Sequence, residues 1–89
     1  MLSVFQTAAF RRDLRKLSRQ GADLSKLGNI VELLVAKKIL EPRHRDHPLS
    51  GDWKGFRDCH VQPDWVLIYR VEDDELQLAR TGSHSDLFG

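Results

Sequence analysis

The hydrophobic pattern of this chain changes its period once, near residue 50, and this change limits the folds open to it. Before that point, apolar side chains recur at three and four residues, which is typical of amphipathic helices. After it, apolar and polar residues alternate, which is typical of strands. A chain whose helices come together, ahead of most of its strands, indicates an α+β domain.

Two helices are predicted in the first half of the chain. The first covers residues 8–20, and the second begins near Leu24 and ends before Pro42. The apolar stripe of the first helix is formed by Phe10, Leu14 and Leu17. The stripe of the second is formed by Leu24, Leu27, Ile30, Val31, Leu34 and Val35. The turn between the helices is short and contains Gly21, so the pair is predicted to form an αα-hairpin.

Strands are predicted at residues 2–6, 53–61, 65–71 and 75–81. The segment at 65–71, WVLIYRV, is apolar on both faces over its first five residues and therefore predicts a central strand. Leu87 and Phe88 are expected to form a short last strand or a docked tail. The expected fold is a single α+β domain, residues 1–89, with the order β-α-α-β-β-β(-β). Its antiparallel sheet carries the two N-terminal helices on one face and leaves the other face free to bind a ligand.

The charge of the chain is unevenly distributed. The formal net charge is +1, yet residues 1–45 hold ten Lys and Arg against four acidic residues and residues 46–89 hold four against nine. The halves therefore carry about +6 and −5, and such asymmetry indicates a polyanionic partner. The basic side chains of the first helix are a solvated face or a surface for RNA.

Several classes of protein are excluded by composition. No apolar run approaches the roughly 20 residues of a membrane-spanning helix, and the first residues lack the features of a secretory signal. The single Cys59 cannot form an internal disulfide. A cytoplasmic protein without a membrane partner is the expectation.

Three histidines and one carboxylate are the candidates for chemistry. His47 lies in a loop, His60 and Asp64 flank a predicted turn, and His84 follows the last predicted strand. Imidazoles at one end of a sheet would suit proton transfer near pH 7. The alternative is that each histidine is simply solvated. Compact metal-binding spacings such as HxxxH are missing, so neither a metal nor another cofactor is expected.

Three blocks of sequence resemble the RelE superfamily of bacterial toxins, and most closely its YafQ branch. They are DHPL at 46–49, GxWKGxRDxHVxPDWxLIY at 51–69 and RTGxHxxLF at 80–88. The resemblance covers nearly the whole chain and implies the toxin of a type II toxin–antitoxin system with a microbial-RNase-like fold. It implies a ribosome-dependent endoribonuclease, an mRNA interferase, that cuts mRNA in the ribosomal A site and so inhibits translation. A cognate antitoxin would neutralise the toxin, and operator DNA would be bound only through the complex.

The resemblance also assigns roles to residues. The family's catalytic positions fall on His47, His60, Asp64 and His84. Its substrate- and phosphate-binding positions fall on Arg80, Phe88 and Trp65. The implied mechanism has His60, oriented by Asp64, and His84 in proton transfer, while His47 binds the phosphate. Arg80 would stabilise the developing charge, and Phe88 would stack on a base.

The first helix gains a specific role in this interpretation. Arg11, Arg15 and Arg19 are candidates for binding ribosomal RNA, a contact that should weaken as salt rises. Two other functions stay open for the same scaffold: a non-catalytic module that binds RNA or the ribosome, and a module that binds only an antitoxin.

Overall fold

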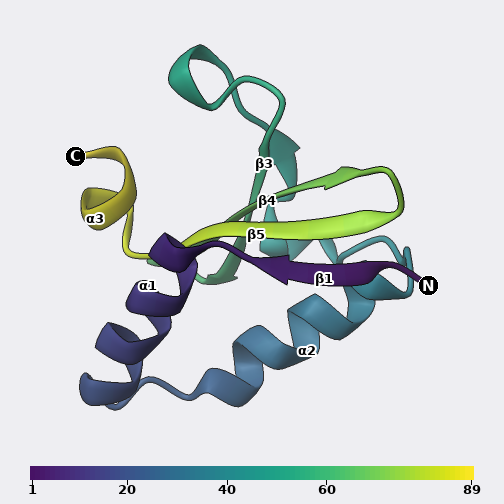
Figure 1. The fold of residues 1–89 in the computed structure, drawn as a ribbon. Helices are drawn as coiled ribbons and strands as arrows, with labels where there is room; N and C mark the ends of the chain where they lie inside the picture. The colour runs from purple at the N-terminus through teal and green to yellow at the C-terminus, as the bar shows by residue number, and fades with distance from the viewer.

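The protein, described over residues 1–89 by a computed structural model, is built on one five-stranded sheet (Figure 1). The strand order across the sheet is β1-β5-β4-β3-β2. The strands are β1 Ser3–Gln6, β2 His47–Pro48, β3 Arg57–Gln62, β4 Trp65–Glu72 and β5 Glu75–Gly82. The last three form the antiparallel meander that the alternating pattern predicts. The predicted order is therefore confirmed for β1, the two helices, β3, β4 and β5, although β3 begins at Arg57 rather than at residue 53.

The two predicted helices are present and lie beneath the sheet in Figure 1. They are α1 Ala8–Arg19 and α2 Leu24–Val35. The side-chain oxygen of Thr7 caps α1 by accepting from the N–H of Phe10 at 3.0 Å. Asp23 caps α2 by accepting from the N–H of Ser25 at 3.1 Å. Gly21, at a φ of 79° that suits glycine, makes the turn between them.

The main hydrophobic core lies between these helices and the sheet. It comprises thirteen buried residues, among them Phe10 of α1, Ile30 of α2, and Leu67 and Leu76 of the central strands. Cys59 belongs to this core and is fully buried, as expected for a small apolar side chain. No helix is long and apolar enough to cross a membrane.

The opposite face of the sheet is covered in part, whereas the sequence led us to expect it to be free. Its buried cluster contains four residues: Val66, Ile68, Ala79 and Leu87. Leu49, Trp53 and Phe56, from the loop before β3, pack against it. The apolar side chains that alternate outward from β4 need this cover, which explains why the strand is apolar on both faces.

Two details depart from the expected sheet. First, β1 pairs in parallel with β5. The N–H of Leu2 donates to the carbonyl oxygen of Val35 at 3.0 Å, so the helical hairpin returns the chain to the beginning of β1. The meander that follows then gives β5 the same direction as β1.

Second, the end of the chain is a short helix, α3 His84–Phe88, rather than a strand. Ser83 caps it by accepting from the N–H of Asp86 at 3.2 Å. Leu87 docks on the sheet, so the expectation of a docked tail is met in helical form. The segment before β3 also differs from the predicted loop, since it contains the 3-10 turns η1 Pro42–His44 and η2 Gly51–Trp53. Between them His47 and Pro48 form the short edge strand β2, which pairs with β3.

Candidate active site

His60, His84 and Phe88 form a row of rings at one end of the sheet. The ring centroids of His60 and His84 are 5.1 Å apart, and those of His84 and Phe88 are 5.8 Å apart. Gly82, at a φ of 154° that is essentially confined to glycine, turns the chain out of β5 and into α3. This turn brings His84 to the end of β3, the strand that carries His60.

Asp64 lies beside His84 rather than beside His60, contrary to the expectation from sequence. Its Oδ1 atom accepts from the backbone N–H of His84 at 3.4 Å and is 3.7 Å from the Nδ1 atom of the same residue. The carboxylate is therefore placed to stabilise positive charge on the His84 ring. His60 instead takes its orientation from the carbonyl group of Pro63.

A buried carboxylate, Asp58, lies next to His47, and no role was predicted for this residue from the sequence. The two residues face each other in the β2–β3 pair, and Asp58 is 3% exposed. Oδ1 of Asp58 is 3.1 Å from Nδ1 of His47. Burial raises the pKa of Asp58, and the charges of His47, His60 and His84 oppose that shift. The available signal was strand alternation, which places Asp58 on the same face as His60.

Backbone carbonyl groups fix the histidine rings. Nδ1 of His47 is 2.6 Å from the oxygen of Arg45, and Nδ1 of His60 is 3.3 Å from the oxygen of Pro63. A carbonyl oxygen can only accept, so each Nδ1 carries a proton and Nε2 of the neutral ring is left as the acceptor. The same geometry leaves Oδ1 of Asp58 buried without a hydrogen bond. Both rings thus have the tautomer that a general base requires.

The strand β2, which begins with His47, is held on the sheet by the neighbouring residue Asp46. Oδ1 of Asp46 accepts from the hydroxyl of Tyr69 at 2.7 Å and from Nε of Arg57 at 3.1 Å. Burial is the largest cause of the raised pKa of Tyr69, so this phenol stays protonated and donates. Because Asp46 is held in place, the backbone position of the next residue, His47, is fixed as well.

Arg80 makes its hydrogen bonds on the side of α1. Its Nε atom donates to Oδ2 of Asp13 at 2.7 Å, and its Nη2 atom donates to Oδ1 at 3.1 Å. The side chain of Arg80 is 30% exposed, so it is also open to solvent. The structure thus joins Arg80 to the first helix, while the imidazoles gather around Asp58 and Asp64.

Trp65 differs from the expectation that it contacts substrate. It is 6% exposed in the main core, and its indole Nε1 donates to the hydroxyl of Thr81 at 2.9 Å. The Thr81 hydroxyl in turn donates to the carbonyl oxygen of Val66 at 2.9 Å. Trp65 therefore ties the start of β4 to the end of β5, next to the strand end from which α3 leaves.

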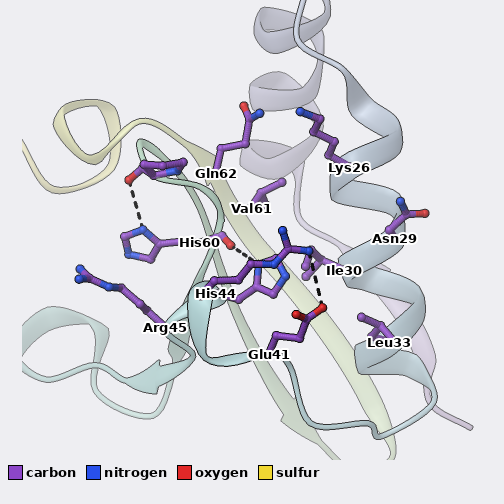
Figure 2. Close-up of a pocket in the computed structure, with 12 residues that line it drawn as sticks. Lys26, Asn29, Ile30, Leu33, Glu41, His44, Arg45, His60, Val61 and Gln62 are labelled. Atoms are coloured by element: carbon purple, nitrogen blue, oxygen red, sulfur yellow. Dashed lines mark hydrogen bonds and ion pairs between the residues drawn. The ribbon is translucent and has the colours of Figure 1, made fainter.

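A cleft of about 770 Å³ begins at His60 and runs round the edge of β3 to α2 (Figure 2). Figure 2 shows Arg45 and His60 at one side of it and Lys26 of α2 at the other. At its centre, Nδ1 of the buried His44 is 2.7 Å from the carbonyl oxygen of His60. The cleft offers positive charge beside the row of rings, which suits the phosphates that flank a bound RNA position.

The arginines of the first helix are exposed. Arg11, Arg15 and Arg19 make no ion pair with an acidic side chain, so their charge is available to an external partner. Asp13, the one acidic residue of the helix, is 13% exposed and turned toward Arg80.

The remaining ionisable side chains bear on which chemistry the site can perform. No group of three or more His, Cys, Asp or Glu side chains is arranged to hold a metal ion. Burial raises the pKa of the Cys59 thiol to about 12, so it stays protonated and is a poor nucleophile. The arrangement instead offers imidazoles for proton transfer, with a carboxylate at His84 and another at His47.

Comparison with known proteins identifies the family. Residues 2–89 match the family model described as the bacterial toxin of a type II toxin-antitoxin system, YafQ. The chain belongs to the YafQ toxin family. The match covers nearly all of the chain, including every residue of the candidate site. The family assignment confirms the resemblance carried by the three sequence blocks, and the chain is a toxin of a type II toxin–antitoxin system.

This YafQ family member has similar relatives both in sequence and in structure. The mRNA interferase toxin YafQ of Escherichia coli is 42% identical over 81 residues, which cover 90% of this chain and 88% of that protein. A crystal structure of a copper-bound mutant toxin from Helicobacter pylori is 46% identical, with a TM-score of 0.95 over 99% of this chain and 100% of that one. The toxin in a crystal structure of the E. coli DinJ–YafQ toxin–antitoxin complex is 38% identical, with a TM-score of 0.90 over 99% and 98%.

Proposed function

We propose that this toxin cuts mRNA in the ribosomal A site and thereby inhibits translation. The chain is an endoribonuclease of the mRNA interferase type, as its E. coli relative at 42% identity is named. The observation that carries the mechanism is the row of His60, His84 and Phe88, with Asp64 at its side. This row is exposed at one end of the sheet, where a single RNA strand can reach it.

The proposed reaction is transfer of the phosphate within the RNA strand. The ribose 2′-oxygen attacks the adjacent phosphorus, the bond from phosphorus to the 5′-oxygen breaks, and the products are a 2′,3′-cyclic phosphate and a 5′-hydroxyl. One group must accept the proton of the 2′-hydroxyl, and another must protonate the leaving oxygen. His60 and His84, with their rings adjacent, are the pair that does so.

The surrounding residues stabilise the charges of this reaction. Asp64 stabilises the positive charge on His84, and Asp58 does the same for His47, which binds the phosphate. Arg80 contributes positive charge against the developing negative charge on the phosphate. Trp65 supports the site by holding the end of β5 from within the core.

Phe88 completes the site as a stacking platform. It is 44% exposed and lies next to His84. An unstacked base of single-stranded RNA gains affinity by lying on such a ring. The A site would supply the mRNA in an extended form and so compensate for the small size of the protein.

The proposal includes three partners besides mRNA. A cognate antitoxin would neutralise the toxin, because a relative at 38% identity forms the E. coli DinJ–YafQ toxin–antitoxin complex. Operator DNA would be bound only through that antitoxin complex. The ribosome would be bound through Arg11, Arg15 and Arg19 of α1, whose charges are free. The site of action would be the cytoplasm.

Induction of the chain alone in cells, followed by mapping of new 5′-hydroxyl ends of mRNA, tests this function. We expect cuts at defined codons, in the reading frame that the ribosome imposes. His60→Ala and His84→Ala should each reduce cleavage by about 10²–10⁴-fold, whereas Glu32→Ala, on the exposed side of α2, should cut normally. Growth arrest without new ends would show a non-catalytic module, and normal cleavage by both histidine variants would refute the mechanism.

A further inference from the structure

Asp13 is the only acidic residue of α1 and the only one of its charged side chains turned inward. We propose that Asp13 is a positioning residue for RNA cleavage, which aims the guanidinium group of Arg80 and fixes the strand end that leads to His84. The inference rests on the proposed role of Arg80 in stabilising transition-state charge. It adds a function for α1 beyond the contact of its arginines with the ribosome.

The contacts of Asp13 define the orientation of Arg80. Oδ2 and Oδ1 accept from Nε and Nη2 of the guanidinium at 2.7 and 3.1 Å, which is a bidentate pair. Such a pair fixes the plane of the guanidinium as well as its position. It occupies the Nε–Nη2 edge, so Nη1 is left for a phosphate oxygen. The same pairing raises the pKa of Arg80 and keeps its charge permanent.

A third contact of Asp13 reaches the backbone of the next residue. Oδ2 also accepts from the N–H of Thr81 at 3.0 Å. The hydroxyl of Thr81 is held from the other side by Trp65 and Val66. Gly82 follows directly and turns the chain toward His84. Asp13 therefore holds the last fixed point of β5 before the segment that carries His84 and Phe88.

The burial of Asp13 separates it from an ordinary surface charge. Its side chain is 13% exposed, whereas those of Lys16 and Asp86, which also join α1 to the C-terminal segment, are 50% and 43% exposed. The exposed pair, with its 3.2 Å contact, contributes little because solvent screens it. Both links begin on α1, and the buried one ends on β5 while the exposed one ends on α3. The exposed link is therefore a control for the buried one.

The test measures three quantities for each variant: the single-turnover rate of mRNA cleavage on saturating ribosome complexes, the Kd for ribosomes, and the melting temperature. Asp13→Ala should slow cleavage by about 10- to 100-fold, because misplacement of a catalytic group by about an ångström has effects of this size. Its Kd should change less than twofold. Asp13→Asn keeps the shape and removes the charge, so it serves if Asp13→Ala does not fold. Asp86→Asn should cleave at the normal rate.

Arg80→Ala and the Asp13→Ala/Arg80→Ala double variant separate the possible outcomes. If Asp13 acts through Arg80, Asp13→Ala should have little further effect on the cleavage rate of Arg80→Ala. An equal loss in both backgrounds would overturn the inference and assign Asp13 a structural role. So would normal cleavage by a folded Asp13 variant while Arg80→Ala is slow. If Arg80→Ala itself cleaves normally, the proposed role of Arg80 is at fault.

Discussion

The two faces of the sheet are packed to different depths, and the proposed chemistry lies on the thinner one. The face under α1 and α2 buries thirteen core residues, whereas the other face buries four beneath a loop and α3. His60, His84 and Phe88 belong to the thinly covered side. The deep core can supply most of the stability, so the thin side is free to keep polar and aromatic groups exposed.

A pair of leucines tests this division most directly. Leu67→Ala, in the deep core, should lower the free energy of unfolding by about 3 kcal/mol, because it leaves a cavity among tightly packed side chains. Leu87→Ala, on the thin side, should cost about 2 kcal/mol, at the low end for such changes, because its small cluster can relax around the gap. The cleavage rate should respond in the opposite order, since Leu87 anchors α3 and with it His84.

Urea unfolding gives the stabilities, and single-turnover cleavage by the folded proteins gives the rates. Equal losses of rate in the two leucine variants would break the comparison, because stability and chemistry would then share the same contacts. A larger loss of stability in Leu87→Ala than in Leu67→Ala would have the same meaning.

The buried charge of the thin side gives a second test, with a smaller effect. Burial raises the pKa of Asp58 above its ordinary value of 3.8, so the folded protein holds this proton more tightly than the unfolded chain does. Stability should therefore fall as pH rises from about 4 through the raised pKa. Asp58→Asn removes this loss. The melting temperature of the variant, relative to that of the wild type, should therefore rise as pH rises over the same range.

Melting curves of both proteins between about pH 3 and pH 8 decide the sign. A variant that falls behind the wild type as pH rises would show that attraction between Asp58 and the histidines exceeds the cost of burying the carboxylate. The wild-type protein on its own gives no answer, because every other carboxyl group titrates in the same range.

The smallest effect on stability is expected on the outer surface of α1. Reversal of Arg11, Arg15 and Arg19 to glutamate should weaken binding to ribosomes and lower its salt slope by about two, as the loss of three phosphate contacts requires. The melting temperature should hardly change, because these side chains are exposed. Lys38→Glu, beyond the end of α2, is the control. Unchanged ribosome affinity in the triple variant would show that these three arginines do not bind the ribosome.

Hydrophobic periodicity was sufficient to predict the order of β1, the two helices and the meander of β3, β4 and β5, and both faces of β4. It could not predict the partner of β1, because the hydrophobic pattern of a four-residue strand does not specify which edge strand of the sheet it pairs with. The final helix does have a signal in the sequence, because Ser83 followed three residues later by Asp86 is the pattern of a helix N-terminus. The apolar pair Leu87 and Phe88 obscured it.

The candidate site was predictable in its membership and less so in its pairings. The sequence blocks gave His60, His84 and Phe88, which the fold brings together. The partner of Asp64 depended on the turn at Gly82, which swings His84 back over the end of β3. Asp58 became apparent only with the fold, because its burial depends on how the segment before β3 folds against the sheet. Asp13 was visible as a lone acid, yet its contact with Arg80 spans 67 positions of the chain.

The parallel pairing of β1 with β5 has a consequence for the order in which the molecule assembles. The helical hairpin and the meander can each form from near neighbours, but contacts such as that of Thr7 with Ala79 close a loop of 72 positions. Loop closure of this length is costly in entropy and makes such contacts slow to form. The link between Asp13 and Arg80 belongs to the same late set, so a chain that has formed only its local units does not yet hold Arg80 in place. Nuclease activity should therefore appear in refolding experiments with the slowest phase, after most of the helical signal has returned.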